Sequence, residues 1–324
     1  MSSDFIPWVE KYRPKFINQI ISNNDNIKIL TSMLKKGSLP HLIFHGTSGT
    51  GKTSLIDALV FELYGNNVNL MVMKLDASDD RGINSVREEI KGFAEKKNMF
   101  YTGIKIIILD EADSMTFDAQ FALRRIIEKY SETTRFCLIC NYENKIIPAI
   151  RSRCANFRFN PLHATDIILL LKKICDNENL KYTDDSLNII AYLCNGDLRK
   201  NINLLQSISM KTDFITENIC YESAGLPARS DINKIYNYLY SDVTTFKETH
   251  INVYNLIKQN GYSLGIIIKE ITNLLLKEEI SESKKFAELF SNLSDLEHKV
   301  SRSTFDDIYI SALISIFKKL NSNK

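Results

Sequence analysis

The feature that most constrains the fold is a glycine-rich segment at residues 46–53, GTSGTGKT, which fits the pattern G-x-x-x-x-G-K-T. It follows the short apolar run HLIFHG at residues 41–46 and precedes a helical pattern that begins at Ser54. A loop of this kind between a strand and a helix is the context in which the pattern forms a phosphate-binding loop, or P-loop. The sequence therefore predicts a nucleotide-binding α/β domain around residue 50.

The residue types in this loop suit phosphate chemistry. Glycines let backbone N–H groups curl around phosphate oxygens, and the N-terminus of the following helix adds positive potential. Lys52 is predicted to reach the terminal phosphates, and the Thr53 hydroxyl to hold Mg²⁺. The predicted nucleotide contacts of this segment are Gly46, Thr47, Ser48, Gly49, Thr50, Gly51, Lys52 and Thr53.

Strand and helix patterns alternate up to about residue 160. The runs LMVMKLD (70–76), KIIILDE (105–111) and RFCLICN (135–141) are continuously apolar, as in strands covered on both faces. Helical patterns at 84–97 and 117–130 separate them. The predicted first domain, residues 1–160, is a parallel three-layer α/β sheet.

The character changes after Asn160 and Pro161, where amphipathic helical patterns replace the strand-like runs. We expect a helical domain over 161–226, a break at Leu226 and Pro227, and a third, all-helical domain over 227–324. Its helices are expected near 231–240, 244–259, 262–278, 280–299 and 304–320. The aliphatic stripe of this domain is interpreted as core, with an oligomer interface as the alternative; it comprises Ile266, Ile267, Ile268, Ile271, Leu274 and Leu275.

Acidic and amide side chains follow two of the predicted strands. Asp110 is placed to hold the Mg²⁺ shell, and Glu111 to orient or deprotonate an attacking water. Two acids at a strand end can also be solvated charges, but the upstream P-loop favours a catalytic role. Asn141 ends the next strand, from which its amide can reach the same water or the γ-phosphate, unless it is an ordinary turn residue.

Arginines elsewhere leave two interpretations open. Arg199, in Gly196-Asp-Leu-Arg, begins a helix from which it could reach a bound nucleotide, but by itself it could equally be a surface charge. Arg81 and Arg87 flank the start of the 84–97 helix, and Lys91 lies one turn after Arg87. That face could follow nucleic-acid phosphates, although spacing alone favours a solvated helix face.

Composition excludes several classes of protein. A net charge of +2 gives no bulk basicity, and no apolar run approaches the roughly 20 residues that span a bilayer. The N-terminus has no signal-peptide core, so an intracellular protein is expected. Its six cysteines are interpreted as reduced and mostly buried. Cys137 and Cys140 form C-x-x-C on a predicted strand, where an offset of three points them to opposite faces and disfavours a zinc or redox site.

Several motifs together resemble those of the replication factor C small subunits, the sliding-clamp loaders among the AAA+ ATPases. They cover the first 225 residues in order and spacing, and the helical remainder is similar in length and character. Besides the P-loop, they are WVEKYRP (8–14), LDASDDRGI (75–83), IILDEAD (107–113), AQFALRR (119–125), SRC (152–154) and GDLRK (196–200). The resemblance implies an AAA+ ATPase domain, a helical lid and a helical collar that holds five subunits together.

The resemblance also implies roles for single residues. Val9, Tyr12 and Arg13 become nucleotide contacts, while Asn141 and Arg199 become the first and second nucleotide sensors.

The second arginine of Ile150-Arg-Ser-Arg-Cys, Arg153, becomes an arginine finger for the ATP of an adjacent subunit. Lys145 joins Arg81, Arg87 and Lys91 as a DNA-phosphate contact, and Arg124 and Arg125 are placed to link the ATP site to DNA or to a neighbour.

The implied activity is Mg²⁺-dependent ATP hydrolysis that opens a ring-shaped clamp similar to PCNA and loads it onto primer–template DNA. The implied partners are the other subunits of a heteropentamer, the clamp and the DNA. The implied location is the nucleus in a eukaryote, and otherwise the cytoplasm or a viral replication site.

Two residues depart from the family pattern. Thr47 and Ser48 stand where the family usually has paired prolines, and Arg151 stands where many relatives have an uncharged residue, which leaves open which arginine dominates. The alternatives are a structural subunit that binds ATP with little hydrolysis, or another AAA+ machine such as a branch-migration helicase or initiator. A GTPase is disfavoured because neither Asn144-Lys145 nor Asn233-Lys234 continues to the aspartate that recognises guanine.

Overall fold

The computed structural model describes residues 6–21, 23–78, 83–96, 103–241, 244–276, 283–303 and 307–322. The chain divides into two compact units, Met1–Ile215 and Thr216–Lys324, which are taken in turn. Within the described ranges, no helix has both the length and the apolar character needed to cross a bilayer.

The first unit is built on a parallel sheet in the order β2-β3-β4-β1-β5. The strands are β1 (His41–Gly46), β2 (Val72–Asp76), β3 (Lys105–Asp110), β4 (Thr134–Cys140) and β5 (Cys154–Phe159). β1 lies between β4 and β5, so the loop that follows β1 opens at the carboxyl edge beside the ends of β3 and β4. In open parallel sheets this edge is where ligands bind.

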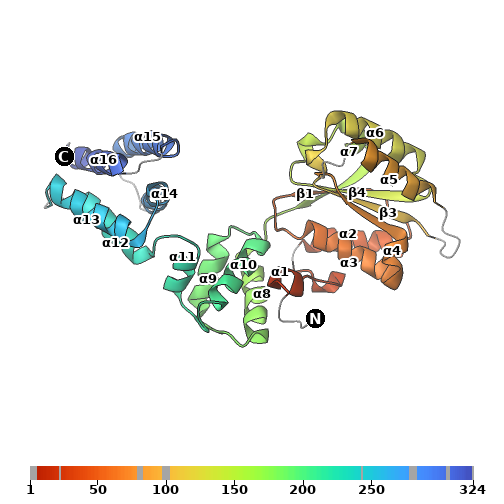
Figure 1. Ribbon diagram of the computed structural model, residues 1–324, viewed down its shortest axis with the longest axis horizontal. Coiled ribbons are helices and arrows are strands. Elements are labelled where there is room, and N and C mark those ends of the chain that lie inside the picture. Colours follow the sequence, from red (N-terminus) through yellow and green to blue (C-terminus); the bar gives the residue numbers. More distant parts are fainter. Residues whose placement is uncertain are drawn as a thin grey trace. The chain divides into compact units, whose positions relative to one another are not determined.

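Helices cover both faces of this sheet (Figure 1). One face carries α2 (Asn24–Lys35), α3 (Lys52–Tyr64) and α4 (Val68–Met71), and the other carries α5 (Ile83–Glu95), α6 (Phe117–Lys129) and α7 (Pro148–Arg151). Alternate side chains of β1 point to opposite faces of the sheet. Leu42 and Phe44 pack against α3, and Ile43 packs into the core under α6 and α7. The predicted three-layer α/β architecture is confirmed.

The C-x-x-C pair follows the same alternation. Cys137 lies in the core layer on the α3 side of the sheet, and Cys140 lies in the core layer on the α6 side. Both thiols are free, and burial raises the pKa of each above its ordinary value. The prediction that they face opposite ways is confirmed.

The structure differs from the sequence predictions at the start of β2 and in one additional strand, β5. Residues 70–71 belong to α4 and not to β2, because a short apolar run does not distinguish the end of a buried helix from a strand. β5 was not predicted. It is an edge strand that pairs with β1 alone, and its exposed Asn156 and Arg158 interrupt the apolar pattern.

The remainder of the first unit is mainly helical. It contains α1 (Trp8–Lys11) near the N-terminus, followed after the sheet by α8 (Ala164–Asn177), α9 (Asp184–Leu193) and α10 (Leu198–Ser209). The short strands β6 (Lys181–Tyr182) and β7 (Phe214–Ile215) pair in parallel. These two-residue strands were not predicted, since they are too short to show a period. The predicted helical character of this region is confirmed.

The second unit is helical in its described residues. Its helices are α11 (Glu217–Ser223), α12 (Arg229–Tyr240), α13 (Phe246–Asn260), α14 (Leu264–Leu275), α15 (Ser283–Val300) and α16 (Asp307–Ser322). Ile267, Ile268, Ile271 and Leu275 of α14 are at most 1% exposed and pack against α12, α13, α15 and α16. These four residues and the partly buried Leu274 belong to the core, as predicted, whereas Ile266 of the predicted stripe is partly exposed and is not part of this cluster. The predicted domain limits at residues 160 and 226 stay a prediction.

Candidate nucleotide-binding site

A cavity of about 430 Å³ opens in the first unit at the carboxyl edge of the sheet. Four regions contribute to its wall: the α1 segment, the P-loop with the start of α3, the ends of β3 and β4, and the start of α10. The lining residues are Val9, Glu10, Tyr12, Arg13, Pro14, Ser48, Gly49, Thr50, Gly51, Lys52, Thr53, Ser54, Asp110, Glu111, Ile139, Cys140, Asn141, Leu198, Arg199 and Ile202.

The P-loop backbone depends on two close approaches that only glycine allows. Gly46 has φ +146°, and a Cβ there would lie 2.2 Å from the carbonyl oxygen of Phe159. Gly49 has φ +71°, and a Cβ there would lie 1.9 Å from a carboxylate oxygen of Asp197. Gly51 precedes α3 without a side-chain cap, so the N–H groups of the first turn of α3 are available to an anion.

Lys52 is 8% exposed and points into the wall of the cavity. Its Nζ donates to the carbonyl oxygens of Gly46 and Thr47, each at 2.8 Å, and to Oδ1 of Asn141 at 3.1 Å. Burial lowers the pKa of this ammonium group. All three acceptors are neutral, so an anionic phosphate would be a stronger partner for the charge.

Thr53 and Asp110 form the part of the site that suits a metal ion. The Thr53 Oγ1 donates to Oδ2 of Asp110 at 3.1 Å, which places a hydroxyl and a carboxylate oxygen side by side. Mg²⁺ prefers such oxygen ligands and keeps waters and substrate phosphates as its other ligands. No group of three or more His, Cys, Asp or Glu side chains within the described ranges could hold a metal by itself. The two residues fit Mg²⁺ that binds together with a nucleotide.

Glu111 has an unusual backbone conformation, with φ +53° in the left-handed region. Its N–H donates to Oδ1 of Asp110 at 3.0 Å, and its carbonyl accepts from Oγ of Ser114 at 2.7 Å. Non-glycine residues adopt this conformation at a cost of about 1 kcal/mol or more, and such residues concentrate at functional sites. The turn exposes the Glu111 side chain at the cavity beside Asp110.

The α1 segment is attached to both the lid helices and the sheet domain. Lys11 Nζ lies 2.5 Å from Oε1 of Glu178, and the Tyr12 hydroxyl donates to the same oxygen. Burial, followed by this contact, raises the pKa of Tyr12 above its ordinary value. Arg13 lies 2.7 Å from Oδ2 of Asp57 on α3. The predicted nucleotide contacts Tyr12 and Arg13 thus line the cavity, while their polar ends bind Glu178 and Asp57.

The start of α10 lies directly on the P-loop. The N–H of Leu198 donates to the carbonyl oxygen of Gly49 at 3.2 Å, and Asp197 caps the helix by accepting from the N–H groups of Arg199 and Lys200. Arg199 lines the cavity from the first turn of α10 and is exposed. The structure therefore brings Arg199, Lys52, Asn141 and the two acids to one pocket.

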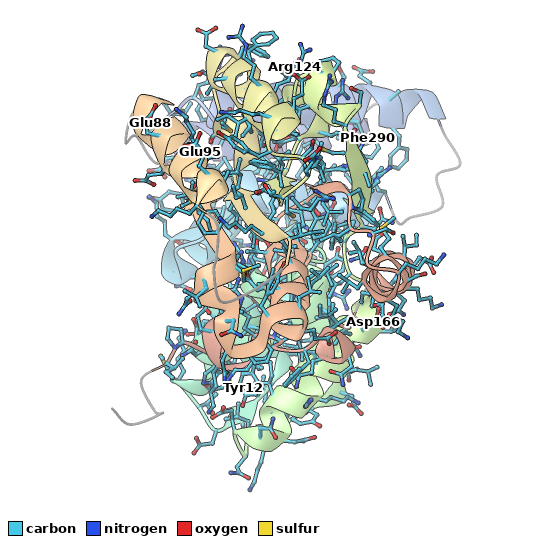
Figure 2. The ribbon with its side chains drawn as sticks, turned by 90° about the vertical axis from the view of Figure 1, so that its right-hand side faces the viewer. Tyr12, Glu88, Glu95, Arg124, Asp166 and Phe290 are labelled. Carbon is cyan, nitrogen blue, oxygen red and sulfur yellow. The ribbon has the colours of Figure 1, made fainter. Side chains whose placement is uncertain are left out.

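Arg153 lies elsewhere. It is not one of the residues that line the cavity in the described part of the chain. Its guanidinium donates to the carbonyl oxygen of Ala149 at 2.6 Å and lies 2.5 Å from Glu128 of α6. Arg124 binds the same carboxylate. Figure 2 shows Arg124 at the top of the view and Tyr12 in its lower half, so this arginine cluster lies away from the α1 wall of the pocket.

The predicted DNA contacts are only partly described. Arg81 lies outside the described residues, as does the side chain of Arg87. Lys91 on α5 is exposed, and so is Lys145, whose Nζ lies 5.2 Å from the ring centroid of Tyr142. The DNA-contact prediction therefore remains a prediction.

Several pocket residues were not predicted from the sequence. Leu198 and Ile202 stand one turn apart on α10 and supply an apolar wall, together with Ile139 and Cys140 of β4. Their spacing on a helix that begins Asp-Leu-Arg could have been used to find the first two. The supporting contact of Glu178 joins segments far apart in the sequence, and no local pattern could have found it.

Family models match three consecutive parts of the chain. The ATPase family associated with various cellular activities (AAA) matches residues 42–162, an RCF1/5-like AAA+ ATPase lid domain matches 169–210, and the replication factor C C-terminal domain matches 227–315. The three matches follow the same order as the predicted ATPase, lid and collar regions.

Similar proteins extend over nearly the whole chain. "Probable replication factor C subunit 5" of Dictyostelium discoideum is 43% identical over 97% of this chain and 90% of its own length. "Replication factor C subunit 5" of Homo sapiens is 40% identical over 97% of this chain and 92% of its own length. "Replication factor C subunit 3" of Saccharomyces cerevisiae is 38% identical over 100% of this chain and 96% of its own length.

Among solved structures, the Thermotoga maritima RuvB Holliday junction branch migration motor has a TM-score of 0.52 at 14% identity, over 79% of this chain and 88% of that one. A single-residue variant of the same RuvB protein gives a TM-score of 0.53, also at 14% identity, over 78% and 86%. At this identity the likeness shows a shared fold and nothing more. The sequence relatives are far closer, and on their full-length similarity together with the three family matches, this chain belongs to the replication factor C small subunits of the AAA+ ATPase family.

Proposed function

We propose that this chain hydrolyses ATP as one subunit of a clamp loader and that it completes a second ATP site with Arg153. The observation that carries the proposal is the separation of Arg153 from the other predicted catalytic residues of the first unit. Two hydrogen-bonded pairs, Lys52 with Asn141 and Thr53 with Asp110, line one pocket, whereas Arg153 lies outside it. The pocket has residues suited to bind phosphate, a metal ion and water, but Arg153 of the same chain lies outside it. Such a site is suited to completion by an arginine from a neighbouring subunit.

Each residue of the pocket has a task in this proposal. Lys52 would exchange its neutral acceptors for phosphate oxygens, and the N–H groups at the start of α3 would hold the other phosphates. Thr53 and Asp110 would hold Mg²⁺, which when bound neutralises charge on the phosphate oxygens. Glu111 would orient or deprotonate the attacking water, with Asn141 contacting that water or the γ-phosphate.

The start of α10 would link the nucleotide to the lid. Arg199 lies where it could contact phosphate, and the Leu198–Gly49 hydrogen bond already joins the lid to the P-loop. Tyr12, Arg13 and Val9 would form the adenine side of the pocket. The α1 segment that carries them is fixed at Glu178 and Asp57, so the adenine wall would be in place before nucleotide binds.

Arg153 would supply positive charge to the γ-phosphate held by an adjacent subunit. An arginine finger given in trans stabilises transition-state charge without occupying its own subunit's pocket. Its exposure of 36% leaves the guanidinium accessible to a neighbour while Ala149 and Glu128 orient it. Arg124 belongs to the same cluster and would face the same neighbour.

The relatives' names support other replication factor C subunits as partners. The resemblance to the family extends the proposal to a heteropentamer that acts on a PCNA-like clamp and primer–template DNA, in the nucleus of a eukaryotic cell. Exposed Lys91 and Lys145, together with Arg81 and Arg87, would contact DNA phosphates and would therefore bind without sequence preference.

A structural subunit with little hydrolysis of its own is the second candidate. It would need nucleotide binding and Arg153 but not Glu111. The left-handed turn that presents Glu111 at the cavity beside Asp110 favours the hydrolytic subunit.

Arg153→Ala in a reconstituted clamp-loader complex tests the proposal. Nucleotide affinity of this subunit should be unchanged, and hydrolysis at the adjacent site should fall on the order of a hundredfold. Arg158→Ala, at an exposed arginine of β5, is the matched control. Normal clamp- and DNA-stimulated turnover with Arg153→Ala would refute the role of Arg153 in trans.

A further inference from the structure

Arg151 lies two residues before Arg153, and the contacts of Glu143 explain the position of its side chain. Glu143 begins the short turn η5 (Glu143–Lys145), two residues after Asn141. One of its carboxylate oxygens, Oε1, accepts from Nδ2 of Asn156 at 3.2 Å and lies 3.8 Å from the nearer terminal nitrogen of Arg151. Its other oxygen, Oε2, lies 3.4 Å from Nε2 of His45.

These contacts join three elements at one carboxylate. His45 stands on β1 directly before Gly46, the first residue of the P-loop; Arg151 ends α7; and Asn156 lies on β5. β1 and β5 are adjacent strands, so Glu143 lies over their seam on the α7 side of the sheet. The Glu143 side chain is 30% exposed and that of His45 is 17% exposed, which makes this a partly buried cluster.

Arg151 is placed to neutralise Glu143 and not to bind a phosphate of its own pocket. It does not line the cavity, its side chain is 34% exposed, and its Nε is buried without a hydrogen-bond partner among the described residues. A guanidinium in this position is turned inward toward Glu143. Removing its charge would leave a partly buried carboxylate uncompensated, which is more damaging than replacing both members of the pair.

The segment that carries Arg151 also fixes Arg153. The N–H of Arg151 donates to the carbonyl oxygen of Ile147, and the N–H of Arg153 donates to that of Ile150. Both arginines therefore belong to one short turn, and a shift of Arg151 moves the backbone of Arg153.

We propose that Glu143, neutralised by Arg151, is a positioning residue for the Arg153 finger, because it joins the loop bearing Asn141 and the strand before the P-loop to the turn that carries Arg153. This proposal rests on the proposed function of Arg153 in trans. Neither Glu143 nor Arg151 lines the nucleotide cavity, so in this proposal they act by fixing the turn that carries Arg153 relative to the sheet.

The test uses reconstituted complexes in which the adjacent site alone can hydrolyse ATP. Glu143→Gln and Arg151→Gln should each lower kcat at that site about fivefold or more, with KM for ATP unchanged. The double variant, in which both charges are removed, should recover most of this loss. Glu132→Gln, at an exposed acid between α6 and β4, is the matched control, and thermal melting of each variant subunit checks its fold.

Including Arg153→Ala in the series separates the possible failures. If Arg153→Ala lowers turnover and neither single variant does, the positioning role is wrong and the proposed function stands. If Arg153→Ala has no effect, both are wrong. If Arg151→Gln costs as much as Arg153→Ala and the double variant recovers nothing, Arg151 itself contacts the phosphate, which also overturns the positioning role.

Discussion

Arg153 and Arg124 bind the same carboxylate oxygen of Glu128: the terminal nitrogen of Arg153 lies 2.5 Å from it, and Nε of Arg124 lies 3.0 Å from it. The hydrogen bond from Arg124 and the charges of both arginines lower the pKa of Glu128. Glu128 is therefore ionised near neutral pH and holds two arginines of one cluster together.

Glu128→Gln should weaken this cluster. The variant keeps the shape of the side chain but removes its charge, so Arg153 would spend less time in one orientation. We expect kcat at the adjacent ATP site to fall roughly threefold to tenfold, less than with Arg153→Ala, because misplacement costs less than loss of the charge. Steady-state hydrolysis by the complex measures this, and a loss equal to that of Arg153→Ala would contradict an orienting role.

Glu111→Gln should separate nucleotide binding from hydrolysis in this subunit. Its backbone turn and the Thr53–Asp110 pair do not depend on the Glu111 carboxylate, so ATP affinity should change by less than about twofold, while single-turnover hydrolysis should fall on the order of a hundredfold. Asp118→Asn, at an exposed acid of α6, is the control. Full turnover with Glu111→Gln would favour a different base.

Glu178→Gln should loosen the α1 segment. Glu178 holds both Lys11 and Tyr12, and removing its charge weakens the attachment of a segment that lines the cavity. We expect ATP affinity, measured by titration with a fluorescent analogue, to fall about fivefold, which is a typical loss for weakened preorganisation. Asp184→Asn removes a more exposed ion pair with Lys172 on the same group of helices and should leave affinity unchanged.

His41 should make the stability of the first unit depend on pH. Burial, followed by the charge of Arg135, lowers the pKa of His41 to about 4, and its Nδ1 accepts from the N–H of Phe136 at 3.1 Å. The unfolded chain, with a histidine pKa of about 6.5, binds more protons between these two values. The contribution of His41 to the free energy of unfolding is therefore fully present above about pH 6.5. It falls by about 3 kcal/mol as the pH decreases toward 4.

His41→Asn keeps an acceptor for Phe136 and removes this titration. The fall in melting temperature between pH 7.5 and pH 5 should be smaller in the variant than in the parent protein. His163→Asn, at an exposed histidine, is the matched control. Equal pH slopes for the parent and His41→Asn would show that His41 does not contribute.

Local pattern was enough to predict the elements that build the pocket. The P-loop, the apolar strands at 105–110 and 134–140, and the polar residues that end them follow simple rules of period and position. Because parallel strands end at one edge, these rules also predict that Lys52, Asp110 and Asn141 meet, as their contacts and shared cavity show.

Contacts between distant segments could not be predicted in this way. Tyr12 with Glu178 and Arg153 with Glu128 join residues from separate elements, and nothing in the local sequence marks either acid as a partner. The strand β5 was missed for a related reason: at the edge of the sheet, its exposed polar residues remove the apolar run by which the other strands were recognised.

The position of β1 between β4 and β5 has a consequence for synthesis of the chain. β1 ends at the P-loop, yet its neighbours begin at Thr134 and Cys154, so neither exists when β1 leaves the ribosome. Until residue 140 has emerged, neither edge of β1 has a strand to pair with, and its β5 edge stays open until residue 159, so the nascent chain is exposed to aggregation. The nucleotide site is thus among the last features of its domain to form, and chaperone binding during translation should concentrate on the interval between residues 46 and 159.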